Sequence, residues 1–294
     1  MNTTRIRIPA AALLAALLAG CGGGGGTTPA QPAAPPQSLS RVPASAVATI
    51  VIPPKGPVAS SSDRRPMWVS PSTSAIQINA KRLSDGFTDS IVQALTPTTS
   101  GCSAQPNGST LCLVPFAAPP TTGSDLDDIT IYVLDSTNYS QAFNLGFLET
   151  QQPVSATQVN NFTFVIGGVP DRIAYTATPP SVTAATVADI ALKITPQDAD
   201  LNPINGAFDS PVLASVTGTA ATHFTITAPA ASGGVLSIAD PTKLPVNGIT
   251  VHYDGLATKG QSAVVIFQTN STAEQQNHGG TLPRTVGSIT IPVN

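Results

Sequence analysis

The chain has 294 residues, of which 41% are hydrophobic and only 10% charged, and its formal net charge is −3. About 25% charged residues is usual in soluble domains, so the chain is poor in ionisable groups. A wholly disordered chain is excluded, because disorder combines low hydrophobicity with high charge. The 13 Lys and Arg residues form no run that could follow a phosphate backbone, so nucleic acid is not an expected partner.

Residues 1–20 have the layout of a secretory signal peptide. Arg5 and Arg7 precede an apolar stretch over residues 8–20, and Cys21 and a glycine tract follow it. As a helix, this stretch would be about 20 Å long, which is short of the roughly 30 Å hydrocarbon core of a bilayer. We therefore expect a leader that is removed and not a permanent membrane span.

The Leu-Ala-Gly-Cys sequence at residues 18–21 resembles the lipobox of bacterial lipoproteins. In that family a peptidase cuts before the cysteine after its thiol has been acylated. The resemblance implies a lipid anchor on Cys21 and export to the bacterial cell envelope. The residue after the cysteine is Gly22 and not Asp. In lipoproteins of Gram-negative enteric type, the absence of Asp at this position is compatible with export to the outer membrane or cell surface. The alternative is an ordinary secretory signal with a chance cysteine.

Residues 21–45 contain the cysteine, the glycine tract and then Pro29, Pro32, Pro35 and Pro36 among Thr, Ala, Gln and Ser. This composition cannot form a hydrophobic core, and it is typical of a flexible linker with a root-mean-square reach of roughly 27 Å. We expect it to hold a folded body away from the membrane surface.

Period-two alternation of apolar and polar residues dominates the rest of the chain and predicts β-strands with one buried face. The alternating runs cover residues 76–80, 129–133, 162–166, 190–194, 224–227, 249–253 and 288–293. Residues 264–267 are apolar on both faces, as in a central strand. Helix signals are nearly absent, because the one stretch with helical spacing, residues 87–95, is rich in β-branched residues that favour a strand.

Many short strands separated by turn signals predict an all-β fold of two tandem antiparallel Ig-like β-sandwich domains. The sequence Gly-Gly-Val-Pro-Asp at residues 167–171 is the best break between them. We expect one domain over residues 46–170 and the other over residues 171–294.

Residues 190–206 resemble the strand, turn and next strand of bacterial immunoglobulin-like domains of the invasin type. In that family an Asp, a small residue, a Gly-Asn-Pro and a later Gly mark the turn, whereas Leu201 here stands before Asn202 and Pro203. Residues 68–73 resemble a block in uncharacterised exported lipoproteins. The first resemblance implies a sandwich in the C-terminal half, and the second brings no activity with it.

Cys102 and Cys112 flank the turn sequence Pro106-Asn107-Gly108. A type I turn closed by a left-handed glycine at this place puts the two cysteines opposite each other in a hairpin. Export to an oxidising compartment then favours a disulfide. The alternatives are two free thiols, or a metal site, for which no histidine or third cysteine lies near in the sequence.

Asp198, Asp200 and Asn202 superficially resemble a calcium loop, because oxygens at alternate positions can converge on a hard cation. Pro203 stands where an EF-hand needs glycine, and no Glu follows at position twelve. A capped turn between strands is therefore expected. A second acidic group precedes a predicted strand and is expected to be solvated: Asp125, Asp127 and Asp128.

The three histidines lie in no recognisable nucleophile, zinc or acid–base motif: His223, His252 and His278. His252 is expected on the outward face of a strand and His278 in a polar loop. We predict no cofactor, no metal site and no enzymatic activity, although carboxylate pairs for glycoside cleavage need only spatial proximity.

The expected function is a cell-envelope lipoprotein that acts as a non-catalytic binding, adhesive or spacer module. Its partners would be the membrane, through the lipid anchor, and a protein or glycan ligand. The alternative is a carbohydrate-binding or carbohydrate-cleaving sandwich in which aromatic rings stack on sugars: Trp68, Tyr132, Tyr139 or Tyr253. Exposed aromatics gathered in one groove beside two carboxylates would favour this alternative.

Overall fold

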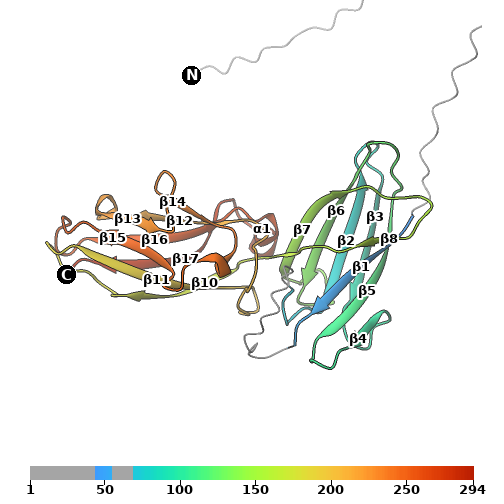
Figure 1. The fold of residues 1–294 in the computed structure, drawn as a ribbon, viewed down its shortest axis with the longest axis horizontal. Helices are drawn as coiled ribbons and strands as arrows, with labels where there is room; N and C mark the ends of the chain where they lie inside the picture. Colours follow the sequence, from blue (N-terminus) through green and yellow to red (C-terminus); the bar gives the residue numbers. More distant parts are fainter. Residues whose placement is uncertain (1–43, 55–68) are drawn as a thin grey trace, which may run out of the picture. The chain divides into compact units, whose positions relative to one another are not determined.

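The computed structural model describes residues 44–54 and 69–294, and this part of the chain is almost entirely β (Figure 1). It forms four sheets, which confirms the predicted all-β class. None of the helices in this part is long and apolar enough to cross a membrane. The predicted signal peptide, the linker before residue 44 and Trp68 lie outside the described residues.

The N-terminal sandwich packs a four-stranded sheet against a five-stranded sheet. The first has the order β4 (Cys102–Ala104), β5 (Thr110–Ala118), β1 (Ala44–Ile52) and β8 (Asn160–Phe162). The second has the order β3 (Thr88–Ala94), β2 (Ala75–Arg82), β6 (Asp127–Leu134), β7 (Asn144–Gln152) and β9 (Gly167–Gly168). All pairings are antiparallel except the short parallel pairing of β1 with β8.

The core of this sandwich follows from the alternation in its strands. Ile76, Ile78 and Ile131 point inward and are at most 1% exposed, whereas Gln77 and Tyr132 lie on the outward face. Of the run predicted at residues 162–166, only Phe162 belongs to a strand, although Phe164 and Ile166 are buried. Phe164 and Ile166 therefore pack into the core from a segment that does not pair with a neighbouring strand.

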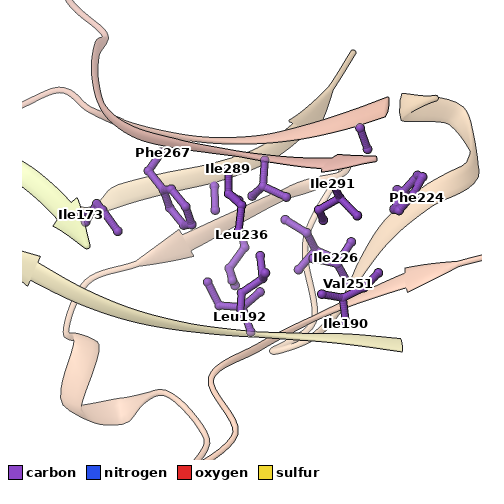
Figure 2. Close-up of a cluster of buried hydrophobic side chains, with 14 of the residues drawn as sticks. Ile173, Ile190, Leu192, Phe224, Ile226, Leu236, Val251, Phe267, Ile289 and Ile291 are labelled. Atoms are coloured by element: carbon purple, nitrogen blue, oxygen red, sulfur yellow. The ribbon is translucent and has the colours of Figure 1, made fainter. Parts of the chain in front are cut away.

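The C-terminal sandwich packs two four-stranded sheets around its own apolar core, part of which Figure 2 shows. One sheet has the order β10 (Arg172–Thr178), β11 (Ala188–Gln197), β15 (Ile249–Tyr253) and β13 (Phe224–Ala228). The other has the order β14 (Val235–Ile238), β12 (Val212–Thr217), β16 (Ser262–Thr269) and β17 (Arg284–Pro292). Two 3-10 turns, η1 (Ala221–His223) and η2 (Pro241–Lys243), and one helix, α1 (Thr272–His278), connect strands.

The strand order of this domain is that of an immunoglobulin-like sandwich. Strands β10, β11, β15 and β13 correspond to the A-B-E-D sheet, and β12, β16 and β17 to the C-F-G sheet. The additional strand β14 extends the second sheet at β12. Strand β16 is central, as its apolar run predicts, although Val264 and Ile266 are only partly buried.

The prediction of a polar loop around His278 is wrong. Residues Thr272–His278 form α1, and Ser271 caps its start by accepting a hydrogen bond from the Glu274 N–H at 3.0 Å. Helix α1 contributes no wide apolar stripe, because only Ala273 and Glu274 are buried. Its position depends instead on polar contacts, which are described below.

Candidate functional site

The two cysteines of the predicted hairpin form a disulfide. Cys102 and Cys112 are directly opposite each other in the pairing of β4 with β5, and their sulfurs are bonded. Gly108 has a φ of +80°, as the predicted turn requires. The disulfide ties β4 to the sandwich. Cys21, the predicted lipidation site, lies outside the described residues.

The group at Asp198 is a capped turn, as expected, and its carboxylate is satisfied by the protein. Oδ1 of Asp198 accepts hydrogen bonds from the backbone N–H groups of Asp200 at 3.0 Å and Asn202 at 2.8 Å. The Asn202 amide also donates to the hydroxyls of Ser70 at 3.1 Å and Ser72 at 2.9 Å. Asp198 is buried, and burial raises its pKa.

The expectation that Asp127 is solvated is wrong. Asp127 is fully buried at the start of β6, opposite the fully buried Arg82 on β2. Arg82 is itself paired with Asp85, at 3.0 and 2.8 Å, and donates to the Pro120 carbonyl at 2.8 Å. Burial raises the pKa of Asp127 to about 7, although the Arg82 charge opposes this shift. Asp125 remains closer to the surface and accepts a hydrogen bond from Ser84 at 2.6 Å.

Each of the three histidines pairs with an aspartate. The partners are Asp254 for His223 at 3.1 Å, Asp189 for His252 at 2.7 Å, and Asp171 for His278. Over residues 44–54 and 69–294, no hydroxyl or thiol hydrogen-bonds to a histidine ring. These pairs therefore do not form a Ser-His-Asp arrangement within that part of the chain.

Around α1, three potential metal ligands come together that sequence reasoning did not connect. Asp171, Glu274 and His278 each place one ligand atom within 4.8 Å of the others. The buried Glu274 already pairs with Arg284, whose Nε lies 2.7 Å from Oε1. Burial raises the pKa of Glu274 to about 7, and Arg284 opposes the shift. Since Glu274 is already paired with Arg284 and Asp171 with His278, we assign the cluster the role of fixing α1 against Asp171 and β17.

The three candidate tyrosines do not share one environment. Tyr253 is fully buried in the C-terminal core, stacks on Phe224, and donates its hydroxyl to the Ala257 carbonyl at 3.2 Å. It therefore cannot stack on a ligand. Tyr132 and Tyr139, in contrast, line the same hollow on the N-terminal sandwich.

This hollow lies over the outward face of β2 and β6 and has a volume of about 360 Å³. We call it the Tyr132 hollow. Its walls are formed by Gln77, Asn79, Tyr132, Leu134, Tyr139, Ser140, Ala142, Asn144 and Gln276. Strand alternation explains its floor, since Gln77, Asn79 and Tyr132 alternate with buried isoleucines and a valine. None of these residues is Asp, Glu, Lys, Arg or His.

The loop between β6 and β7 carries Tyr139 and is held by its own hydrogen bonds. The Phe143 N–H donates to the Asp135 carboxylate at 2.8 Å, and the Asp135 N–H donates to the Phe143 carbonyl at 3.2 Å. Tyr139 is 44% exposed at the tip of this loop. Tyr132 is held from the other side by Phe147, whose ring centroid lies 5.1 Å away.

Several polar atoms of the Tyr132 hollow are not used by the protein. Asn79 Oδ1 accepts from the Gln77 amide at 3.2 Å and from the Ser90 hydroxyl at 2.6 Å. Four side-chain groups of the hollow make no hydrogen bond to any described residue: the side-chain carbonyl oxygen of Gln77, the side-chain NH₂ group of Asn79 and the hydroxyls of Tyr132 and Tyr139. The hollow therefore offers a ligand both donors and acceptors beside aromatic rings.

Asn144 and Gln276 complete the wall that lies beside α1. The Asn144 side-chain NH₂ donates to the Ala273 carbonyl at 3.2 Å and to Gln276 at 3.3 Å, and the Asn144 N–H donates to the Asn277 side chain at 2.6 Å. Sequence reasoning named the two tyrosines and missed all the amides. The outward positions of Gln77 and Asn79 in the alternating runs were the available signal for these two residues. Asn144 had no local signal, because its contacts are with residues 129 to 133 positions away.

Comparisons with known proteins add little to this geometry. No protein-family model matches the sequence, and no curated protein matches it. A solved structure of a DUF3823 family protein from Bacteroides uniformis is similar to this chain at 11% identity, over 86% of this chain and 100% of that protein. The TM-score is 0.23, so this likeness carries no argument about fold or function.

Proposed function

We propose that the protein is a lipid-anchored component of the bacterial cell envelope that binds a ligand without catalysis, through the Tyr132 hollow. The observation that carries the binding role is this hollow, in which two tyrosines and four side-chain amides converge without a carboxylate. Aromatic rings and amides bind and orient ligands, whereas bond cleavage at a sugar needs an acid and a second carboxylate or base beside it. The lipobox-like sequence at Cys21 supports the envelope address.

The alternative function, a carbohydrate-binding or carbohydrate-cleaving sandwich, receives unequal support. The pair of tyrosines in one hollow favours binding of a sugar. The lining residues provide none of the carboxylates that the cleaving version needs. Only carbohydrate binding is therefore a candidate, and it is a special case of the non-catalytic module.

Binding without turnover is tested with the full chain carrying Cys21→Ser, incubated with purified envelope polysaccharides and with a synthetic peptide library. We expect one of these to be retained by the protein and recovered at unchanged mass. Shorter products that accumulate with time would contradict the non-catalytic role. Failure to retain either class would contradict the binding role.

The lipid anchor is tested separately by cell fractionation. The Cys21→Ser variant should move from the membrane to the soluble fraction, because two or three acyl chains bind a bilayer almost irreversibly at about 0.8 kcal/mol for each buried methylene. Mass spectrometry of the wild-type N-terminus should show the acyl chains. Unchanged membrane retention of the variant would contradict the anchor, and protease treatment of whole cells would show which side of the membrane the protein faces.

A further inference from the structure

We propose that the ligand of the Tyr132 hollow is an uncharged saccharide. This inference rests on the proposed function, because it names the ligand class of the same surface. It follows from the charge of the hollow, its free hydrogen-bonding groups, its aromatic rings and its place in the sheet.

The side chains that line the Tyr132 hollow are uncharged. The lining side chains carry no acid, base or histidine. A phosphate, a carboxylate or an ammonium group placed there would lose water without gaining an opposite charge, and that loss is costly. The hollow therefore selects for a neutral ligand.

The free hydrogen-bonding groups of the Tyr132 hollow match the hydroxyls of a sugar. A sugar hydroxyl is both a donor and an acceptor, and adjacent hydroxyls on a ring present both roles side by side. Gln77 and Asn79 point outward two residues apart on β2, and between them they leave one free carbonyl oxygen and one free NH₂ group. The free side-chain oxygen of Gln77 can accept from one sugar hydroxyl while the free NH₂ group of Asn79 donates to the adjacent hydroxyl on the same ring.

The two tyrosine rings of the hollow match the faces of a sugar ring. Tyr132 and Tyr139 present an apolar ring face with a polar hydroxyl at its edge. A pyranose ring has the same division, with C–H groups on its faces and hydroxyls around its rim. Phe147 packs on Tyr132, so the ring that would meet the sugar is held in place.

A peptide is not the expected ligand of the Tyr132 hollow. Strands β2 and β6 are interior to their sheet, between β3 and β7, so their backbone groups are already paired and a peptide cannot be added as a strand. The apolar part of the lining is limited to Leu134, which is 5% exposed, and Ala142. That leaves no deep pocket for the large apolar anchor on which peptide and protein interfaces depend.

The inference is tested by isothermal titration of the full chain carrying Cys21→Ser. The probes are neutral hexasaccharides of glucose and mannose, oligogalacturonate as a charged saccharide, and a heptapeptide library. We expect a neutral saccharide to bind and oligogalacturonate to bind at least tenfold more weakly. Tyr139→Ala and Asn79→Ala should each weaken the neutral saccharide about tenfold, while Tyr175→Ala, at an exposed tyrosine on β10, should change the affinity less than twofold.

Because Tyr139 is exposed on a loop, its replacement is a safer test than that of Tyr132, which packs on Phe147. Equal or tighter binding of oligogalacturonate, or no effect of the Tyr139 and Asn79 variants, would overturn the inference. If a peptide binds in a Tyr139-dependent way and no neutral saccharide does, the saccharide is wrong and the proposed binding role stands. If neither class binds, both fail.

Discussion

At the scale of single residues, Leu201 shows how a local departure from a motif reports on backbone conformation. The turn that this segment resembles has glycine at this position, and Leu201 has a φ of +64°. That region costs an L-residue roughly 1–2 kcal/mol. The sequence indicated that Leu201 stands where the similar turns have glycine. The backbone φ of the turn was needed to show that this leucine is strained.

We predict that Leu201→Gly stabilises the protein by about 0.5–1 kcal/mol. Relief of the left-handed backbone exceeds the loss of chain entropy that glycine brings, and little packing is lost because Leu201 is 49% exposed. Urea denaturation followed by circular dichroism measures the change. The control is Leu256→Gly, an exposed leucine without a positive φ, which should lose stability. A loss of stability in Leu201→Gly as well would contradict this account.

Asp127 illustrates what local sequence cannot give at this scale. Its neighbours Asp125 and Asp128 predicted a solvated acidic group, yet Asp127 faces Arg82 across the β2–β6 pairing, 45 residues away. The alternation of β6 directs it inward, and the buried arginine partly offsets its charge. Only the pairing of distant strands makes this environment.

At the scale of elements, the strands were predictable and the helix was not. Alternating runs such as residues 76–80 and 190–194 match β2 and β11, because a sheet with one buried face imposes a period of two. Helix α1 lacks an apolar stripe, so the strongest helix signal is missing. The available signal was the Ser271-Thr-Ala-Glu274 sequence, which has the spacing of a capping box.

We predict that Ser271→Ala lowers the free energy of unfolding by about 1–3 kcal/mol. The serine hydroxyl caps α1 and also donates to the carboxylate of the partly buried Asp209 at 2.5 Å, so its loss removes both the cap and the side-chain donor of Asp209. Urea denaturation measures the loss. Thr281→Ala, at an exposed residue after the helix, should be nearly neutral. Equal stability of Ser271→Ala and wild type would show that the cap does not stabilise the protein.

At the scale of the whole molecule, a few acids buried by tertiary contacts determine how stability responds to pH. Burial raises the pKa of Asp127 and Glu274 to about 7 and that of Asp209 to about 6. An acid whose pKa is higher in the folded state binds more protons there, so the unfolded state is favoured as pH rises. The sequence could predict two strand-rich halves. It could not predict which of the 16 acids are buried by contacts between residues that are far apart in the chain.

We predict that the free energy of unfolding falls between pH 5 and pH 8, by on the order of 2–4 kcal/mol, since each unit of pKa shift corresponds to about 1.4 kcal/mol. The fall should level off at about pH 8, one unit above the pKa of Asp127 and Glu274, where both have lost their protons. Asp127→Asn should be more stable than wild type at pH 8 and should reduce the pH dependence. Stability that rises over this interval, in urea denaturation at each pH, would contradict the raised pKa values.

The central claim is that the Tyr132 hollow is where the protein binds its ligand. The most direct measurement compares the dissociation constants of wild type and Tyr139→Ala for a neutral oligosaccharide by titration calorimetry. Urea denaturation of both proteins checks that the substitution has not changed the free energy of unfolding. The account predicts measurable binding by wild type and about tenfold weaker binding by the variant, with the same free energy of unfolding for both. Equal affinities, or no binding of any oligosaccharide or peptide by the wild-type protein, would contradict it.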